Sequence, residues 1–478
     1  MGLREKTVSS VKWNTVATVV TLVIGVLQVA ILTRLLERSD FGLIAIASLV
    51  IAFTDIFAEL GITAALIHKQ NITKEIYSSV YWLNIIMSLV IFGLTFLLAP
   101  LVAAFYNQPE LTEIVRLLSL KILFCAFGKM FQTIKTKNLE FAFISKVRIV
   151  TSIVGIITST ALAWFGFGVM SLVWGQLAQV GINQIIFAIA GMRQTRIIFR
   201  FNFAEVKDIL KIGGYQVGTQ MLDFVAARLD VFLIGKFFSM DELGVYNIAK
   251  ELIIKPFSII NSISASVFSA AFAKIQDNLQ AVILNYSKLI KVVSILAVPI
   301  YLLMFIFADL LVSILYAPSF AEVAVYIRIL TVYGILANVT SQGSSVMVAL
   351  GRTDLGLYWT IARIALTMII LLMTAQISLY AVAWGQTGLS IISLFVYFFI
   401  VVKPMLKEMA LKEYFSMFGS IIGASLLIAM PFAVINRCFA VEVCLQLLMA
   451  LLFVCLCILY DKFAHPAIFD EMRKLLRR

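Results

Sequence analysis

Apolar residues along this chain fall into successive runs of roughly 20 positions, separated by brief charged segments. A run of that length crosses a hydrocarbon layer about 30 Å thick as an α-helix. We find no short alternating segments of the kind that indicate membrane-spanning strands. In lipid, a helix also satisfies its own backbone hydrogen bonds. The pattern therefore predicts an all-α integral membrane protein.

The runs predict about fourteen transmembrane helices joined by short connections. The first run, from Trp13 to Leu36, is too long for the apolar part of a cleaved signal, so we expect it to be retained as a span. The predicted spans lie near residues 12–36, 41–67, 80–105, 111–131, 141–165, 169–191, 208–238, 243–270, 284–315, 323–350, 355–375, 378–402, 415–435 and 443–460.

Composition and charge agree with this class. Hydrophobic residues make up 62% of the 478 positions and charged residues 13%, against about 25% in soluble domains. Of the 38 Lys and Arg residues, 28 fall in the segments that are cytoplasmic if the N-terminus is inside, and 6 fall in the outer turns. This bias predicts that both termini are cytoplasmic. It also explains the net charge of +12, so no nucleic-acid partner is needed to account for that charge. The tail over 461–478 is predicted to be a basic amphipathic segment on the inner membrane surface.

An internal repeat divides the chain. Residues 32–47 align with 234–249, so that Asp40 falls on Glu242 and Gly42 on Gly244. A Trp-Gly-Gln triplet recurs at 174–176 and 384–386. Because six spans separate the copies, both halves have the same orientation, as in transporters built from parallel repeats. We predict an N-terminal lobe over 1–196 (helices 1–6), a C-terminal lobe over 197–404 (helices 7–12), and two further helices with the tail over 405–478.

Ionisable residues inside the spans are the candidate functional residues, because a charge at a helix centre costs about 2.5–3.5 kcal/mol unless it faces protein or water. We predict a wet, mostly cationic cavity suited to a pyrophosphate-bearing substrate. Pairing that pins helices together is the open alternative for each charge, and snorkelling to the membrane surface is the alternative for Arg34. The cationic candidates for substrate binding are Arg228, Lys250, Lys255, Lys121 and Arg34. The acidic candidates for the cavity or for ion coupling are Asp55, Glu59, Asp223, Asp230 and Glu251.

Several kinds of chemistry are not expected. There is no GxxxxGK[ST] loop, so the chain by itself is not an ATP-driven pump. The two histidines and five cysteines do not cluster, which argues against a metal site. The outer turns are too short for the catalytic residues of a membrane enzyme. We therefore expect no catalytic residues and no enzymatic activity.

Local segments add a resemblance to a known family. The chain resembles the multidrug/oligosaccharidyl-lipid/polysaccharide exporter superfamily over nearly its whole length. Within that superfamily it is most similar to the polysaccharide transporter branch, which includes the flippases for O-antigen, colanic acid and teichuronic acid units. The matching segments are Ala30–Gly42, Leu60–His68, Arg228–Asp230, Ile234–Lys236, Leu243–Tyr246 and Ala349–Asp354.

The resemblance implies a flippase that moves an undecaprenyl-pyrophosphate-linked oligosaccharide to the periplasmic leaflet of the bacterial inner membrane by alternating access. It places Arg228 and Lys250 at the pyrophosphate. No cofactor is implied, but coupling to an H⁺ or Na⁺ gradient is. The implied partners are the lipid-linked oligosaccharide, membrane lipids, and polysaccharide polymerase and assembly proteins. A multidrug or lipid II transporter of the same superfamily is the first alternative, and a membrane enzyme of polysaccharide assembly is the second.

Overall fold

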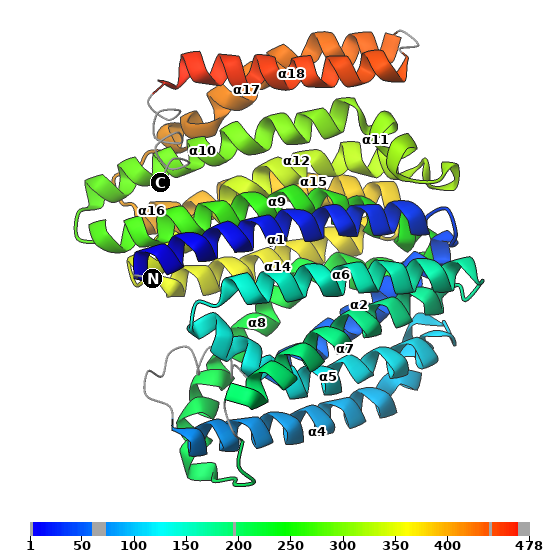
Figure 1. The fold of residues 1–478 in the computed structure, drawn as a ribbon. Coiled ribbons are helices and arrows are strands. Elements are labelled where there is room, and N and C mark those ends of the chain that lie inside the picture. Colours follow the sequence, from blue (N-terminus) through cyan, green and yellow to red (C-terminus); the bar gives the residue numbers. More distant parts are fainter. Residues whose placement is uncertain (1–2, 60–72, 195–196, 439–441, 467–478) are drawn as a thin grey trace. The chain divides into compact units, whose positions relative to one another are not determined.

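A computed structural model describes residues 3–59, 73–194, 197–438 and 442–466 (Figure 1). Throughout these ranges the regular structure is helical. By packing, the chain forms two compact units, Met1–Gly244 and Val245–Arg478. The lobes predicted from the repeat are a different division and stay a prediction.

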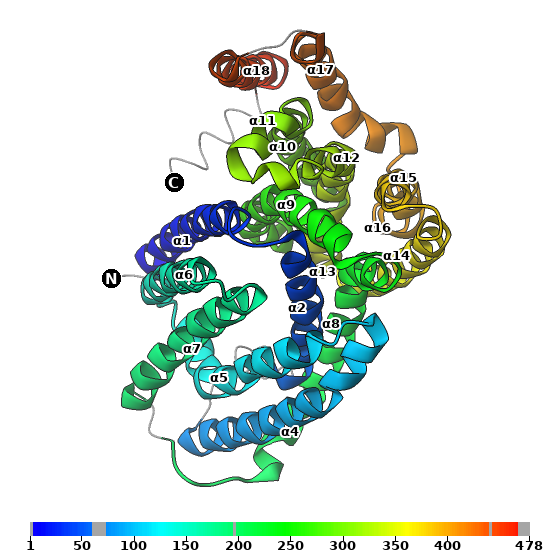
Figure 2. The ribbon, with the colours of Figure 1, turned by 90° about the vertical axis from the view of Figure 1, so that its right-hand side faces the viewer.

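In the N-terminal unit, long helices lie side by side (Figure 2). Helix α5 packs between α4 and α7, and α6 packs against α1 and α7. Helix α2 contacts both α5 and α8, and α8 also contacts α4. These contacts bring one face each of α2, α4 and α8 together. The helices are α1 (Leu3–Leu32), α2 (Arg38–Glu59), α4 (Lys74–Tyr106), α5 (Leu111–Lys137), α6 (Phe141–Trp164), α7 (Val169–Gln194) and α8 (Phe203–Phe237), with the first residues of α9 (Met240–Ile275).

The C-terminal unit contains the rest of α9 and a second set of packed helices. Helix α12 lies between α10 and α15, α14 packs on α15, and α17 packs on α10 and α18. The elements are α10 (Leu279–Ile306), α11 (Ala308–Leu315), a 3₁₀ turn (Pro318–Phe320), α12 (Val323–Ser341), α13 (Gly343–Ala349), α14 (Thr353–Thr374), α15 (Leu379–Tyr397), a π-helical turn (Phe398–Val402), α16 (Lys403–Met405), α17 (Leu411–Cys438) and α18 (Val443–Ala464).

The all-α membrane class is confirmed. Each predicted span contains one long helix of the described chain, and eleven of the spans are long and apolar enough to cross a membrane. The other three, α5, α8 and α9, hold most of the candidate charges, which lowers their mean hydropathy. The count of fourteen spans stays a prediction, and the part of the second predicted span over 60–67 lies outside the described residues.

Two predicted spans are each divided in the structure. The span expected over 284–315 is two helices, because the backbone leaves the α conformation at Phe307 (φ −104°, ψ 28°). The span expected over 323–350 is interrupted at Gln342, between α12 and α13. The side chain of Gln342 bonds to Asn261 Oδ1 at 2.8 Å and to the Asn338 carbonyl at 2.9 Å. Apolar residues flank Phe307 on both sides, so the hydropathy pattern does not reveal the first break. Gln342 falls in a run of polar residues and glycine over 341–345, a local signal that the prediction of one continuous span passed over.

The repeat is visible in local geometry at both copies. Asp40 accepts a hydrogen bond from the Glu37 amide at 3.0 Å, and Glu242 accepts one from the Ser239 amide at 3.0 Å. In each case an acidic side chain in the first turn of a helix reaches back three residues, which satisfies an otherwise unpaired amide. The residues that the sequence alignment pairs therefore make the same cap.

The second half of the polar connection after α7 is fixed to the start of α4. The amides of Ile198 and Asn202 donate to the hydroxyls of Ser78 and Ser79 at 3.0 and 3.1 Å. The Trp82 indole donates to the Ile198 carbonyl at 3.1 Å and packs edge-on against Phe199. The segment that precedes α8 is therefore hydrogen-bonded to the first turns of α4.

Candidate functional site

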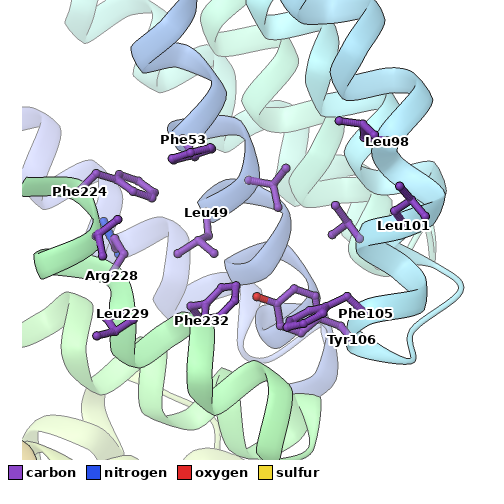
Figure 3. Close-up of a pocket in the computed structure, with 13 residues that line it drawn as sticks. Leu49, Phe53, Leu98, Leu101, Phe105, Tyr106, Phe224, Arg228, Leu229 and Phe232 are labelled. Carbon is purple, nitrogen blue, oxygen red and sulfur yellow. The ribbon is translucent and has the colours of Figure 1, made fainter. Parts of the chain in front are cut away.

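A pocket of about 610 Å³ lies in the N-terminal unit between α2, α4 and α8 (Figure 3). Helical spacing explains the wall, because residues three, four or seven positions apart share one face of a helix. Helix α2 contributes positions 49, 50 and 53, α4 contributes positions 98 to 106, and α8 contributes positions 224 to 232. The lining residues are Leu49, Val50, Phe53, Leu98, Leu101, Val102, Phe105, Tyr106, Phe224, Val225, Arg228, Leu229 and Phe232.

Aromatic rings form contacts around this pocket. Phe105 of α4 stacks on Phe232 of α8, with ring centroids 5.5 Å apart and planes at 26°. Phe53 of α2 packs against Phe224 of α8 at 5.7 Å. Offset and edge-on ring pairs of this kind add about 0.5–1.5 kcal/mol beyond the burial of area. The rings therefore hold α8 against both of its neighbours and make the wall apolar and stiff.

Two of the lining side chains carry polar atoms. Among the thirteen described lining residues, Arg228 is the one that carries a charge. The hydroxyl of Tyr106 is buried and has no hydrogen-bond partner among the described residues. In Figure 3 this oxygen points from α4 into the pocket, on the side of Phe232. The accessible wall of the pocket is nonetheless almost wholly apolar, so the pocket suits an apolar ligand or the apolar part of one.

The other predicted cations occupy different environments. Lys121 donates to Gln176 Oε1 at 3.3 Å, which links α5 to the first Trp-Gly-Gln triplet on α7. Arg34 follows the end of α1, is exposed, and donates back to the Ala30 carbonyl. Lys250 of α9 is 5% exposed, whereas Lys255 is half-buried.

The predicted acids are likewise dispersed. Asp230 is 4% exposed and accepts the Val231 amide at 2.8 Å. Asp55 is half-buried and Asp223 is exposed. Glu251 lies four residues before Lys255 on α9, the spacing of ion pairs along a helix face. The Glu59 side chain lies outside the described residues.

The N-terminal unit thus contains Arg228 on an apolar pocket and Lys121 in a polar contact. The cationic cavity expected between the lobes, and the assignment of all ten charges to substrate or ions, stay predictions. Among the described residues, no group of three His, Cys, Asp or Glu side chains could hold a metal ion. Sequence reasoning missed Tyr106 and the phenylalanine wall, because aromatic residues in an apolar span give no separate signal.

Residues 31–325 match the family described as polysaccharide biosynthesis protein. The chain belongs to this family. The expected placement in the polysaccharide transporter branch is confirmed, and the chain is a multi-pass membrane protein.

Two relatives extend the match over most of the chain. Lipopolysaccharide biosynthesis protein WzxC of Escherichia coli (strain K12) is 26% identical over 407 residues, which cover 85% of this chain and 83% of the relative. Teichuronic acid biosynthesis protein TuaB of Bacillus subtilis (strain 168) is 24% identical over 393 residues, covering 82% and 81%. The similarity to polysaccharide biosynthesis proteins therefore extends beyond residues 31–325.

Among solved structures, the chain is similar to the lipid II flippase MurJ in an inward closed conformation. The TM-score is 0.78, and the similarity covers 96% of this chain and 100% of that one at 13% identity. At this identity the likeness establishes the fold. This chain therefore has the same fold as MurJ.

Proposed function

We propose that this protein moves an undecaprenyl-pyrophosphate-linked oligosaccharide from the cytoplasmic to the periplasmic leaflet of a bacterial inner membrane by alternating access. The observation that carries the proposal is that this chain belongs to a polysaccharide biosynthesis family and also has the fold of a flippase over nearly its whole length. Arg228, held by α8 on an apolar pocket, adds a cation where an amphiphile could bind.

The physical need for such a protein is clear. Each buried polar group of a sugar headgroup that lacks a partner costs several kcal/mol in hydrocarbon. A polar path that opens to one side at a time removes most of that barrier, while the lipid chain stays in the bilayer. The step forms and breaks no covalent bond, so it requires no catalytic residues.

Orientation and energy source belong to the same proposal. Both termini are cytoplasmic, in agreement with the distribution of Lys and Arg. An H⁺ or Na⁺ gradient drives the cycle, and the buried carboxylate of Asp230 is a candidate to respond to the ion. Polysaccharide polymerase and assembly proteins receive the product in the outer leaflet.

Lipid II transport is the second candidate, because the structural similarity to MurJ covers that whole chain. A strain depleted of this protein separates the two. Loss of surface polysaccharide with normal cell-wall synthesis supports the oligosaccharide substrate, whereas lysis with lipid II accumulation supports the alternative.

The direct test follows the leaflet location of the lipid-linked oligosaccharide in depleted cells. We expect accumulation on the cytoplasmic side, rescue by the wild-type protein, and poor rescue by Arg228→Gln. Arg116→Gln is the matched control, because Arg116 lies over Phe96 and outside the pocket. Oligosaccharide that reaches the periplasmic leaflet unpolymerised in depleted cells would contradict flipping and favour an enzyme of assembly.

A further inference from the structure

Three phenylalanines on the connection between α7 and α8 are exposed outside the apolar spans. Phe199, Phe201 and Phe203 are 91%, 46% and 58% exposed. Residues 197–203 belong to none of the eleven helices that are long and apolar enough to cross a membrane. We propose that this phenylalanine row inserts into the headgroup boundary of an anionic phospholipid leaflet and holds the connection there. The proposal does not depend on which solute the protein moves.

The tip of the phenylalanine row is held in a fixed position. Phe199 lies in a tight turn, in which the Arg200 amide donates to the Ile198 carbonyl at 2.8 Å. The Trp82 indole donates to the same carbonyl at 3.1 Å, and its ring packs edge-on against Phe199 with centroids 4.7 Å apart. An unbonded loop can turn an apolar ring away from water, whereas this turn keeps the ring outward. The ring is therefore presented to an apolar medium.

The residues on either side of the row pack into the protein. Ile197 and Val206 contact a buried cluster that includes Val80 and Phe131. The apolar side chains of the connection are thus divided into two sets. Those at its two ends enter the core of the N-terminal unit, and the three phenylalanines between them remain outside it.

Hydrogen bonds to α4 set the depth of the row. Helix α4 has 33 residues, which at 1.5 Å per residue is about 50 Å, longer than a hydrocarbon layer of about 30 Å. The charges of Lys74 and Glu75 identify the start of α4 as an end that extends beyond the hydrocarbon. The connection is bonded to Ser78 and Ser79, about 6–8 Å further along. That level is the boundary between headgroups and hydrocarbon.

Basic residues surround the row. Over 192–204 the sequence has three arginines and no acidic residue. Arg193 and Arg200 are exposed, as is Lys74 at the start of α4, and Glu75 interacts electrostatically with Arg200. The excess positive charge suits anionic headgroups. Phenylalanine beside basic residues is also typical of interfacial segments, which bury their apolar side chains about 5–10 Å into this boundary.

A protein partner is the other occupant that an exposed aromatic row can have. The depth of the row favours lipid, because a segment bonded to the first turns of a membrane-crossing helix lies level with the headgroups around that helix. Helices α1 and α4 begin on the same side of the N-terminal unit (Figure 1). In the proposed orientation this side is cytoplasmic, and the leaflet is the inner one.

Photocrosslinking from position 199 identifies what receives the ring. The full-length protein carries p-benzoylphenylalanine in place of Phe199 and is irradiated in intact cells and in liposomes of equal parts phosphatidylglycerol and phosphatidylcholine. We expect phospholipid adducts on the peptide that contains residue 199. Position 138 is the matched control, because Asn138 is polar and exposed after the end of α5, and it should give at least tenfold fewer adducts. Position 203 provides a second site if the variant at 199 fails to fold.

The charge of the captured lipid is a second readout. We expect phosphatidylglycerol to be about fivefold enriched over phosphatidylcholine, the effect of one basic residue near an anionic surface. Arg200→Gln should lower this enrichment, and salt at about 1 M should remove most of it by screening. Arg116→Gln is the control, because Arg116 lies over Phe96, near the other end of α4, and it should leave the enrichment unchanged.

Several results would overturn the proposal. Adducts to another protein in cells would make the row a protein-docking surface, and adducts between two copies in liposomes would make it a self-association surface. The absence of lipid adducts at both 199 and 203 would show that the row faces water. Equal capture of the two lipids, unchanged by Arg200→Gln and by salt, would rule out recognition of anionic headgroups.

Discussion

Gly42 and Gly244 pack against each other's helices at equivalent points. A Cβ on Gly42 would meet the Met240 carbonyl, four residues before Gly244, and a Cβ on Gly244 would meet the Arg38 carbonyl, four residues before Gly42. The start of α2 and the first turn of α9 thus contact through backbone on both sides. The two glycines that the repeat aligns are the residues that make this contact reciprocal.

Substituting either glycine by alanine should destabilise the protein. The obstructing atom is a main-chain carbonyl oxygen, so no side-chain rotation relieves it, and overpacking of this kind costs about 1–3 kcal/mol. Equilibrium unfolding in mixed detergent measures the change. Gly93→Ala on α4 is the control, because a Cβ there meets nothing within 4 Å. Gly93→Ala should be neutral or stabilising, since alanine favours helix over glycine by about 1 kcal/mol. A Gly42→Ala variant as stable as Gly93→Ala would show that the helices separate freely here.

Removing the paired caps should have matching effects. Asp40→Ala and Glu242→Ala each leave an amide unsatisfied at a helix start, a loss of about 1 kcal/mol. The same unfolding assay applies. Asp241→Ala, at the neighbouring position of the same first turn, should change stability by less. Unequal losses of unfolding free energy in Asp40→Ala and Glu242→Ala would mean that the two caps contribute differently to stability.

Lys121 and Gln176 should be energetically coupled. The hydrogen bond between them joins α5 to α7, so removing either partner leaves the other unsatisfied. In a double-mutant cycle of Lys121→Met and Gln176→Leu, we expect the double variant to lose about 0.5–1.5 kcal/mol less than the sum of the single losses. Strict additivity would indicate that Lys121 serves a ligand and not Gln176.

Tyr301 should contribute stability through its hydroxyl. This oxygen donates to the Ile253 carbonyl at 2.8 Å, three residues before Pro256, and both groups are buried. Hydrogen bonds between membrane helices average about 0.6 kcal/mol and reach about 1.7, so Tyr301→Phe should fall in that range. Tyr106→Phe offers the comparison, because its hydroxyl is buried without a partner and its removal should cost nothing. Equal unfolding free energies for the two variants would contradict a role for the Tyr301 hydrogen bond.

The sequence predicts the long helices well because each apolar run is bounded by charge, as at Val443, where α18 begins at the predicted residue. The interruption at Phe307 could not be predicted, because apolar residues flank it on both sides. The interruption at Gln342 lies in a run of polar residues and glycine over 341–345, which was a usable signal that the long apolar span outweighed. The repeat could be found from Gly42 and Gly244, because at both positions the backbone of the other helix is too close for any residue that has a Cβ.

The candidate site was predictable only in part. Arg228 stands out because a charge inside an apolar span is rare. Its surroundings do not stand out, since Tyr106 and Phe232 come from helices more than a hundred positions apart along the chain and resemble any other apolar residues. The partner of Lys121 was hidden for the same reason, because Gln176 lies 55 residues further on.

The hydrogen bonds that join residues 197–202 to Ser78, Ser79 and Trp82 have a mechanical consequence. A helix that follows an unbonded loop can tilt without displacing its neighbours. The segment before α8 is hydrogen-bonded to α4, so a tilt of α8 also displaces the first turns of α4. Because the last turns of both helices form walls of the apolar pocket, movement at the start of this pair changes the width of the pocket at its end.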